Sequence, residues 1–198
     1  HKKFSESTAV LAGNSLLTMA FEILSDNKFK ISDYKKNRLI NLLSESSGHS
    51  GIAGGQYLDL SYEKKKVSLK RIIAMQLNKT GKLFLFSAVA PIILSGKKNS
   101  LLFFKKLGLE IGLLFQIVDD LLDYSGDTKK LGKKTNKDKK KGKATLISLL
   151  GYKNTVKYSI NLEKKIFKKL NKFNNKKNDI IETILYITQR QKWKNTNF

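Results

Sequence analysis

Three aspartates lie close together in an otherwise apolar stretch of the sequence. Asp119, Asp120 and Asp123 follow the segment Leu114–Val118, although the whole chain has only 16 acidic residues. On a helix, Asp119 and Asp123 share one face, one turn apart, and Asp120 lies about 100° around the axis. Carboxylates this close repel one another, so a buried cluster needs cations nearby. The pattern therefore predicts a site for a hard divalent ion such as Mg²⁺, which takes carboxylate oxygens as ligands.

A second interpretation of these three residues is that they are acids at a helix C-terminus that face water. Acids in that position oppose the helix dipole, and each costs roughly a few tenths of a kcal/mol. This alternative requires a small destabilisation at three positions in turn, so the metal site is the favoured interpretation.

Lysines both precede and follow the acidic cluster. Lys79 is followed by Thr80 and Gly81, whereas Lys133 and Lys143 belong to a lysine-rich segment after the aspartates. A divalent cation on carboxylates, with ammonium groups around it, is a site for a polyphosphate ligand, because each component neutralises phosphate charge. A P-loop is excluded, since no Gly-x-x-x-x-Gly-Lys-Ser/Thr sequence follows a strand pattern.

The composition narrows the possible classes of protein. The chain has 198 residues, 40% apolar and 28% charged, a size that suits one domain with a sizeable core. It has no cysteine, which excludes a disulfide scaffold, a thiol nucleophile and a cysteine-ligated metal. Two histidines are too few for a histidine-rich metal site. One proline against 13 glycines favours long helices over a turn-rich β protein.

The net charge of +23 comes almost entirely from lysine. Only Arg38, Arg71 and Arg190 are arginines among the 39 basic residues. Proteins that recognise bases or clamp phosphates favour arginine, because its planar fork matches those acceptors. We therefore interpret the lysines mainly as a solvated surface and expect no specific nucleic-acid partner, with a basic helical polyanion-binding protein as an alternative.

Apolar residues recur every three to four positions along most of the chain, and no strand pattern is found. The spacing predicts an all-α bundle around one core, with Leu101–Tyr124 as its central helix. The longest apolar run, Leu83–Leu94, contains Pro91 and is shorter than the roughly 20 residues of a membrane span, so we expect no integral membrane protein. The predicted helices are Phe4–Leu24, Asp33–Ser46, Ile52–Leu60, Leu69–Asn78, Leu83–Leu94, Leu101–Tyr124, Ala144–Leu150, Thr155–Phe173 and Ile180–Gln191, with Gly126–Lys143 as a loop.

The first residues look like the inside of a helix, without an initiator methionine or the apolar stretch of a signal peptide. We therefore expect residues to be missing upstream and the protein to be cytoplasmic.

Several blocks of sequence occur in an order that is typical of one family. The most specific is Phe115-Gln116-x-x-Asp119-Asp120-x-x-Asp123, followed by Gly126-Asp127, Leu131-Gly132-Lys133, Asp138 and Gly142-Lys143-x-Thr145. Two more are Gly51-x-x-Gly54-Gly55-Gln56-x-x-Asp59-Leu60 and Lys79-Thr80-Gly81. Together they resemble the trans-isoprenyl (polyprenyl) diphosphate synthases, especially the short-chain bacterial farnesyl/geranylgeranyl type, and the first block resembles their second aspartate-rich motif. The likeness extends over the whole chain, from His1–Leu24 to Ile187–Arg190.

The resemblance implies an isoprenoid-synthase-type helical bundle, with residues 1–198 as a single polyprenyl synthetase domain that lacks its N-terminal part. It implies a prenyltransferase that condenses an allylic diphosphate with isopentenyl diphosphate by Mg²⁺- or Mn²⁺-assisted ionisation, giving a C15 or C20 prenyl diphosphate. It also implies a homodimer. We expect this part alone to be inactive. The alternative is a non-catalytic, prenyl-synthase-like subunit that binds diphosphate.

The resemblance also implies roles for individual residues. Asp119, Asp120 and Asp123 are implied metal ligands. The lysines at 79, 133 and 143 are implied contacts of the allylic diphosphate. Thr80 and Gln116 are implied to lie beside the allylic chain, which makes Lys79, Thr80, Gln116 and Lys133 the expected catalytic set. Gln56 and Asp59 either support this site or form a polar pair in helix packing.

The sequence departs from the family in two respects. The family's first aspartate-rich motif and its adjacent arginine pair are absent from this sequence. The usual Tyr-Pro after the Lys-x-Thr sequence is here Leu146-Ile147.

Overall fold

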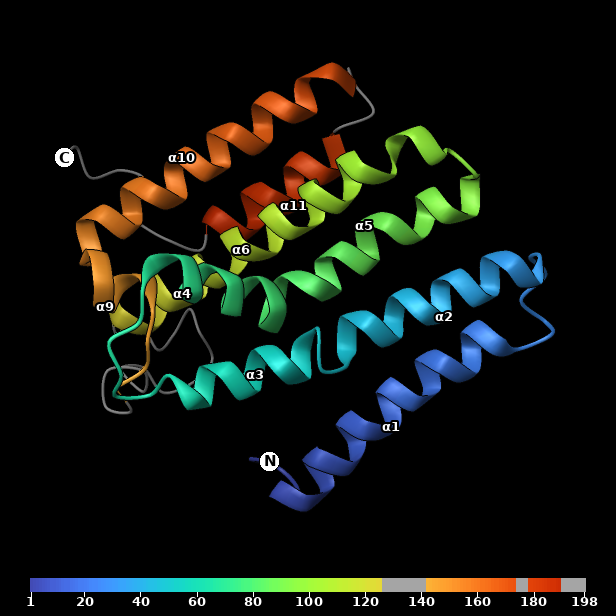
Figure 1. Ribbon diagram of the computed structural model, residues 1–198, viewed down its shortest axis with the longest axis horizontal. Helices are drawn as coiled ribbons and strands as arrows, with labels where there is room; N and C mark the ends of the chain where they lie inside the picture. The colour runs from blue at the N-terminus through green and yellow to red at the C-terminus, as the bar shows by residue number, and fades with distance from the viewer. Residues whose placement is uncertain (126–141, 174–177, 190–198) are drawn as a thin grey trace.

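The computed structural model describes residues 1–125, 142–173 and 178–189, and within these ranges it contains helices and no strand. This confirms the predicted all-α class. Figure 1 shows the helices, most of them running roughly side by side. They are α1 (Glu6–Ser25), α2 (Asp33–Ser47), α3 (Ile52–Ser61), α4 (Leu69–Gln76), η1 (Leu77–Gly81), α5 (Lys82–Ser95), η2 (Lys98–Ser100), α6 (Leu101–Ser125), α9 (Leu146–Leu150), α10 (Tyr152–Leu170) and α11 (Asn178–Gln189).

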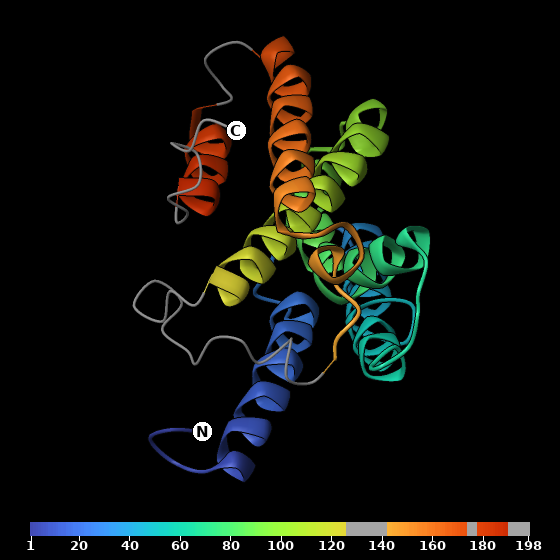
Figure 2. The same ribbon diagram turned by 90° about the vertical axis from the view of Figure 1, so that its left-hand side faces the viewer.

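Helix α6 is the centre of the bundle, as predicted for the longest apolar segment. It packs against α5, α10, α11 and η1. Leu114, Ile117, Val118 and Leu121 on α6 are completely buried, because apolar side chains occur nearly all round this helix and neighbours cover it on several sides. Figure 2 shows α6 passing between α10 and α11 on one side and α2 to α5 on the other.

Helices α4 and α5 are joined without a break by η1, a π-helical turn, into one helix from Leu69 to Ser95. Gly81 does not interrupt it. This helix and α1 are long and apolar enough to cross a membrane by length and composition alone. Because η1 joins two predicted helices, this helix is longer than Leu83–Leu94, the longest uninterrupted apolar run in the sequence. This helix packs against α2, α3 and α6, and 22% of its apolar window is buried.

Helix α1 contacts mainly α2 and has no buried residue. It begins at Glu6 rather than Phe4, because the Ser5 hydroxyl accepts a 3.0 Å hydrogen bond from the Thr8 amide and caps the helix. Figure 2 shows it extending away from α10 and α11. Its exposed apolar side chains are Val10, Leu11, Leu16, Leu17, Met19 and Ile23.

The predicted boundaries after residue 141 shift by a few residues. Helix α9 begins at Leu146, where Thr145 and Ser148 form a reciprocal capping box. Helix α10 begins at Tyr152 rather than Thr155, because Gly151 with its φ of +77° breaks the chain direction immediately before it. Most of the predicted loop, residues 126–141, lies outside the described residues, as does the end of the last predicted helix after Gln189.

Candidate active site

Asp120 is buried and accepts hydrogen bonds on both carboxylate oxygens. The Gln76 amide on α4 donates to Oδ2 at 2.9 Å, and the Gln116 amide on α6 donates to Oδ1 at 2.8 Å. Gln116 precedes Asp120 by one helical turn, whereas Gln76 comes from a different helix. Asp120 therefore ties α4 to α6 through two amides.

The network extends from Gln116 to the π-helical turn. The Thr80 hydroxyl in η1 donates a 2.6 Å hydrogen bond to Oε1 of Gln116. The Gln116 amide nitrogen donates to Asp120, so the amide oxygen of the same side chain faces Thr80. Oε1 of Gln116 can then only accept, so Thr80 donates its proton and keeps its oxygen lone pairs for a ligand.

Asp59 on α3 pairs with two lysines from distant parts of the chain. Its Oδ2 lies 2.5 Å from Nζ of Lys79 in η1 and 4.0 Å from Nζ of Lys143. The Asp59 carboxylate is only 6% exposed, whereas both lysine side chains are about a quarter exposed (23% and 22%). The carboxylate thus holds two partly exposed ammonium groups at one place.

The segment that carries Lys143 is fixed at both of its ends. The amide of Lys64, in the α3–α4 connection, donates a 2.8 Å hydrogen bond to the carbonyl of Gly142. Gly142 has a φ of +66°, which glycine adopts without strain. At the other end, Thr145 caps α9. Lys143 is therefore attached to the bundle on both sides.

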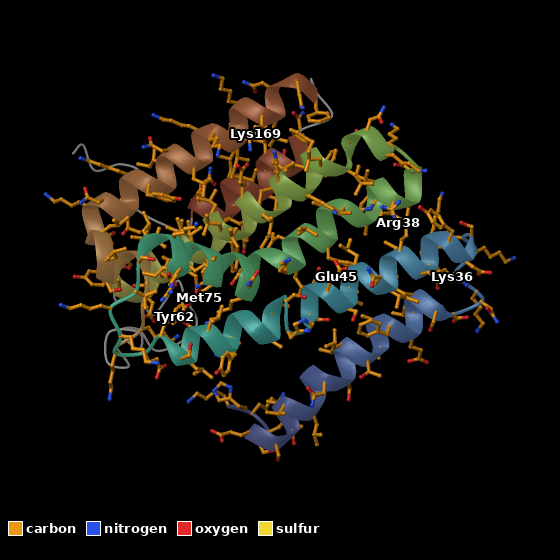
Figure 3. The ribbon with its side chains drawn as sticks, in the orientation of Figure 1. Lys36, Arg38, Glu45, Tyr62, Met75 and Lys169 are labelled. Atoms are coloured by element: carbon orange, nitrogen blue, oxygen red, sulfur yellow. The ribbon has the colours of Figure 1, made fainter. Side chains whose placement is uncertain are left out.

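Two cavities meet along this segment and share Asp120, Lys143 and Thr145. The first, of about 260 Å³, is also lined by Asp59, Met75, Gln76, Lys79, Gln116, Asp119 and Ala144. The second, of about 300 Å³, is also lined by Asp123, Tyr124, Gly142, Ile147, Ser148, Gly151 and Tyr152. Figure 3 labels Met75, which marks the position of the first cavity on α4.

The structure brings most of the predicted site residues to these cavities. Lys79, Gln116, Asp119, Asp120 and Lys143 line the first cavity, and Thr80 joins it through Gln116. Asp123 lines the second cavity, so the two aspartates predicted to share a ligand face border different spaces. Lys133, Asp127 and Asp138 lie outside the described residues.

Asp59 and Gln56, left open between two roles, differ in their surroundings. Asp59 is buried and paired with Lys79, whereas Gln56 is exposed. The arrangement therefore favours a role of Asp59 in the lysine site over a packing pair with Gln56.

Gln76 is a site residue that the sequence analysis missed. It is 2% exposed, donates to Asp120 and lines the first cavity. Its Oε1 atom is buried and, within the part of the chain that the structure describes, has no hydrogen-bond partner. The available signal was a glutamine inside the apolar segment Ile72–Leu77, since buried polar groups are normally paired.

The donor groups around the first cavity suit a hard divalent cation. They are the carboxylates of Asp119 and Asp120 and the unpartnered amide oxygen of Gln76, all oxygen ligands. Among the described residues, no three acidic or histidine side chains converge closely enough to hold a metal by themselves. A cation here would therefore need ligands from elsewhere, and phosphate oxygens are the usual supplement for Mg²⁺.

The second cavity contains an aromatic pair. The rings of Tyr124 and Tyr152 stack with centroids 5.5 Å apart and planes 24° apart. Burial raises the pKa of Tyr152 above its ordinary value, because the ionised phenolate is poorly solvated there. Tyr152 therefore lines the second cavity with an uncharged side chain at physiological pH.

A family model described as polyprenyl synthetase matches residues 1–185. The chain belongs to the polyprenyl synthetase family. The farnesyl diphosphate synthase of Escherichia coli is 41% identical over 154 residues, which cover 76% of this chain and 52% of that protein. That of Buchnera aphidicola is 38% identical over 180 residues, covering 89% of this chain and 62% of that protein. The chain spans about half the length of the curated relatives it matches.

Solved structures of the family share the fold. The Helicobacter pylori geranyltransferase complexed with magnesium and isoprenyl diphosphate matches with a TM-score of 0.81 and 29% identity, over 96% of this chain and 62% of that chain. An FPP/GFPP synthase from Zymomonas mobilis matches with a TM-score of 0.79 and 35% identity, over 94% and 63% of the two chains. These matches confirm the isoprenoid-synthase-type fold and the resemblance found in the sequence.

Proposed function

We propose that this protein is a prenyltransferase that joins an allylic diphosphate to isopentenyl diphosphate and gives a C15 or C20 prenyl diphosphate. We further propose that residues 1–198 belong to one polyprenyl synthetase domain. One observation carries the proposal: Lys79 and Lys143 meet at Asp59 beside a cavity that Asp119 and Asp120 also line. Cationic and metal-binding groups around one space are suited to a diphosphate and to no uncharged substrate.

The lysines act on the leaving group. Lys79 and Lys143 would donate hydrogen bonds to the diphosphate oxygens while Asp59 keeps both ammonium groups oriented. As the bond between C1 and oxygen of the allylic substrate breaks, the electron pair leaves with the diphosphate. The ammonium groups then stabilise the growing negative charge, which is a contribution made mainly in the transition state. We propose the same role for Lys133.

The polar network acts on the other product of ionisation, the allylic cation. Because Thr80 donates its proton to Gln116, its oxygen lone pairs remain available to a positive charge. The double bond of isopentenyl diphosphate would attack C1, and a proton would pass from the new cation to the departing diphosphate. No side-chain nucleophile is needed, in agreement with the absence of cysteine.

We propose that Asp119, Asp120 and Asp123 hold Mg²⁺ or Mn²⁺ together with phosphate oxygens of the substrate, since no three acids among the described residues converge on one point by themselves. The bound cation would supply electrostatic stabilisation of the leaving diphosphate. Magnesium and an isoprenyl diphosphate are named together for the H. pylori geranyltransferase, which supports the assignment. The two hydrogen bonds on Asp120 orient its carboxylate, as is typical of groups that support metal ligands.

We also propose that the protein is a cytoplasmic homodimer. The exposed apolar side chains of α1 offer a surface for a second copy, and the long apolar helix from Leu69 to Ser95 packs against α2, α3 and α6. Light scattering of the purified chain measures the first property, and cell fractionation measures the second.

The test of the function uses geranyl diphosphate with and without Mg²⁺, followed by addition of isopentenyl diphosphate. We expect Mg²⁺-dependent binding in calorimetry, weakened at least tenfold in Asp119→Ala and in Lys79→Ala. Glu110→Ala, which removes an acid from α6 outside both cavities, is the matched control and should bind like the parent. Equal binding by Asp119→Ala and the parent would refute the metal assignment. Formation of a longer prenyl diphosphate would exclude the non-catalytic subunit, whereas binding without product is expected of both, because we expect residues 1–198 alone to be inactive.

A further inference from the structure

We propose that Gly55 and Gly112 are positioning residues that hold η1 in the geometry needed for diphosphate recognition. The proposal rests on the proposed function of Lys79 and Thr80, the side chains of η1 that bind Asp59 and Gln116. A π-helical turn is rare and has poorer backbone geometry than an α-helix, so the surrounding structure must select it.

Gly55 on α3 brings that helix into backbone contact with η1. A methyl group added at Gly55 would overlap the amide nitrogen of Lys79 and lie 2.5 Å from its Cα and 2.7 Å from the carbonyl carbon of Asn78. Ordinary carbon contacts need about 3.5 Å or more. Alanine at position 55 would therefore push α3 and η1 apart by about 1 Å.

Gly112 likewise brings its helix, α6, into backbone contact with η1. Its added methyl group would lie 2.6 Å from Cα of Gly81 and 3.0 Å from the ring of Phe84. Helices α3 and α6 both pack against η1, which the ribbon in Figure 1 places at the junction of α4 and α5. The turn is thus held between two backbones that glycine allows to come close.

One helical turn after each glycine stands the residue that binds a side chain of η1. Asp59, four residues after Gly55, pairs with Lys79 at 2.5 Å. Gln116, four residues after Gly112, accepts from Thr80 at 2.6 Å. Residues four apart share a helix face, so each glycine sets how closely its polar partner approaches η1. A separation of about 1 Å would lengthen either bond beyond hydrogen-bond range.

The decisive experiment is a double-mutant cycle on the unliganded chain. Asp59→Asn is made in the parent and in Gly55→Ala, and unfolding in urea is followed. We expect Asp59→Asn to destabilise the parent clearly. In the Gly55→Ala background, Asp59→Asn should destabilise the protein much less, because the pair of Asp59 and Lys79 is already broken there. Equal effects in both backgrounds would overturn the role of Gly55. A second cycle, Thr80→Val with Gly112→Ala, applies the same criterion if Gly55→Ala does not fold.

A binding experiment then links the glycines to recognition, with inorganic diphosphate and Mg²⁺ as the probe. We expect Gly55→Ala to weaken binding about tenfold or more. Gly108→Ala is the matched control, since its methyl group would lie 2.7 Å from the carbonyl of Phe84 and 2.8 Å from Cα of Leu85, on α5 rather than η1. It should lower the melting temperature without a comparable loss of affinity.

Gly13→Ala is the second control, because its methyl group would meet nothing within 4 Å. If Gly55→Ala and Gly108→Ala lose affinity in the same proportion, the glycines only stabilise the fold and the proposal is overturned. If the parent itself does not bind diphosphate, the proposed function fails, while the cycles still decide whether the glycines position Lys79 and Thr80.

Discussion

Replacing Gln76 by glutamate tests whether Asp120 is ionised at the centre of the polar network. Gln76 is almost completely buried, and its amide nitrogen lies 2.9 Å from Oδ2 of Asp120. Gln76→Glu keeps the size of the side chain but exchanges this donor for a second carboxyl group. Two carboxylates at hydrogen-bond distance do not both ionise, so the new group must keep a proton that it then donates to Asp120.

The free energy needed to keep this proton on the buried glutamate determines how much stability the variant loses. Free glutamate has a pKa of about 4.3, and each unit by which the pH exceeds it costs about 1.4 kcal/mol to hold the proton. The free energy of unfolding of the variant should therefore fall by up to about 5 kcal/mol at about pH 8 and by only about 1 kcal/mol at about pH 5. The sign follows from linkage. The folded variant binds more protons than the unfolded chain, so its stability falls as the pH rises through this range.

Urea unfolding at several pH values measures the effect, with Gln76→Leu as the control. Leucine removes the same hydrogen bond but adds no titrating group, so its cost, about 1–3 kcal/mol, should not depend on pH beyond the parent's own dependence. A proton shared between residue 76 and Asp120 is excluded if the difference in stability between Gln76→Glu and Gln76→Leu does not grow with pH. In that case Asp120 is either neutral or not bonded to residue 76.

Three further changes test the fold around the site. Ile117→Ala, at a completely buried position of α6, should cost about 2–5 kcal/mol in urea unfolding, whereas Ile23→Ala on exposed α1 should change stability by less than about 0.5 kcal/mol. Glu110→Ala removes the acceptor of the 2.6 Å bond from Lys169 and should cost about 1 kcal/mol, less in high salt, because the lysine is partly exposed. Tyr152→Phe should remove the last component of the alkaline titration of tyrosine absorbance, because burial raises the pKa of Tyr152. The contribution of Tyr152 to the free energy of unfolding is present below about pH 10 and is lost as the pH rises through the pKa of the folded state.

The helices were largely predictable because their signals are local. The apolar period predicted each helix to within a few residues, and the length and apolar character of Leu101–Tyr124 predicted that α6 is central. The boundary errors have local causes as well. Ser5 caps α1 and Gly151 opens α10, and both act through hydrogen bonds or dihedral angles that the apolar period does not contain.

The pairing of side chains within the site was harder to predict from the sequence. Lys79 and Asp59 are 20 positions apart, and Gln76 and Asp120 are 44 apart, so pairing depends on how α3 and α6 pack against the junction of α4 and α5. The π-helical turn has no periodic signature of its own, and the sequence suggested only a weak point at Gly81. The exposure of Gln56 beside a buried Asp59 likewise follows from the rotation of α3, which tertiary contacts determine.

Asp120 connects the packing of the bundle to the chemistry that we propose. It accepts a hydrogen bond from the amide nitrogens of both Gln76 and Gln116, which orients these two side chains. Through Gln116 it fixes the proton of Thr80 as well, which leaves the oxygen of that hydroxyl to face positive charge. Asp59 pairs with the positively charged ammonium group of Lys79, which precedes Thr80 by one residue in the same turn. Neighbouring residues of η1 thus present an electron-rich oxygen and an ammonium group, as the two products of an ionising allylic diphosphate require.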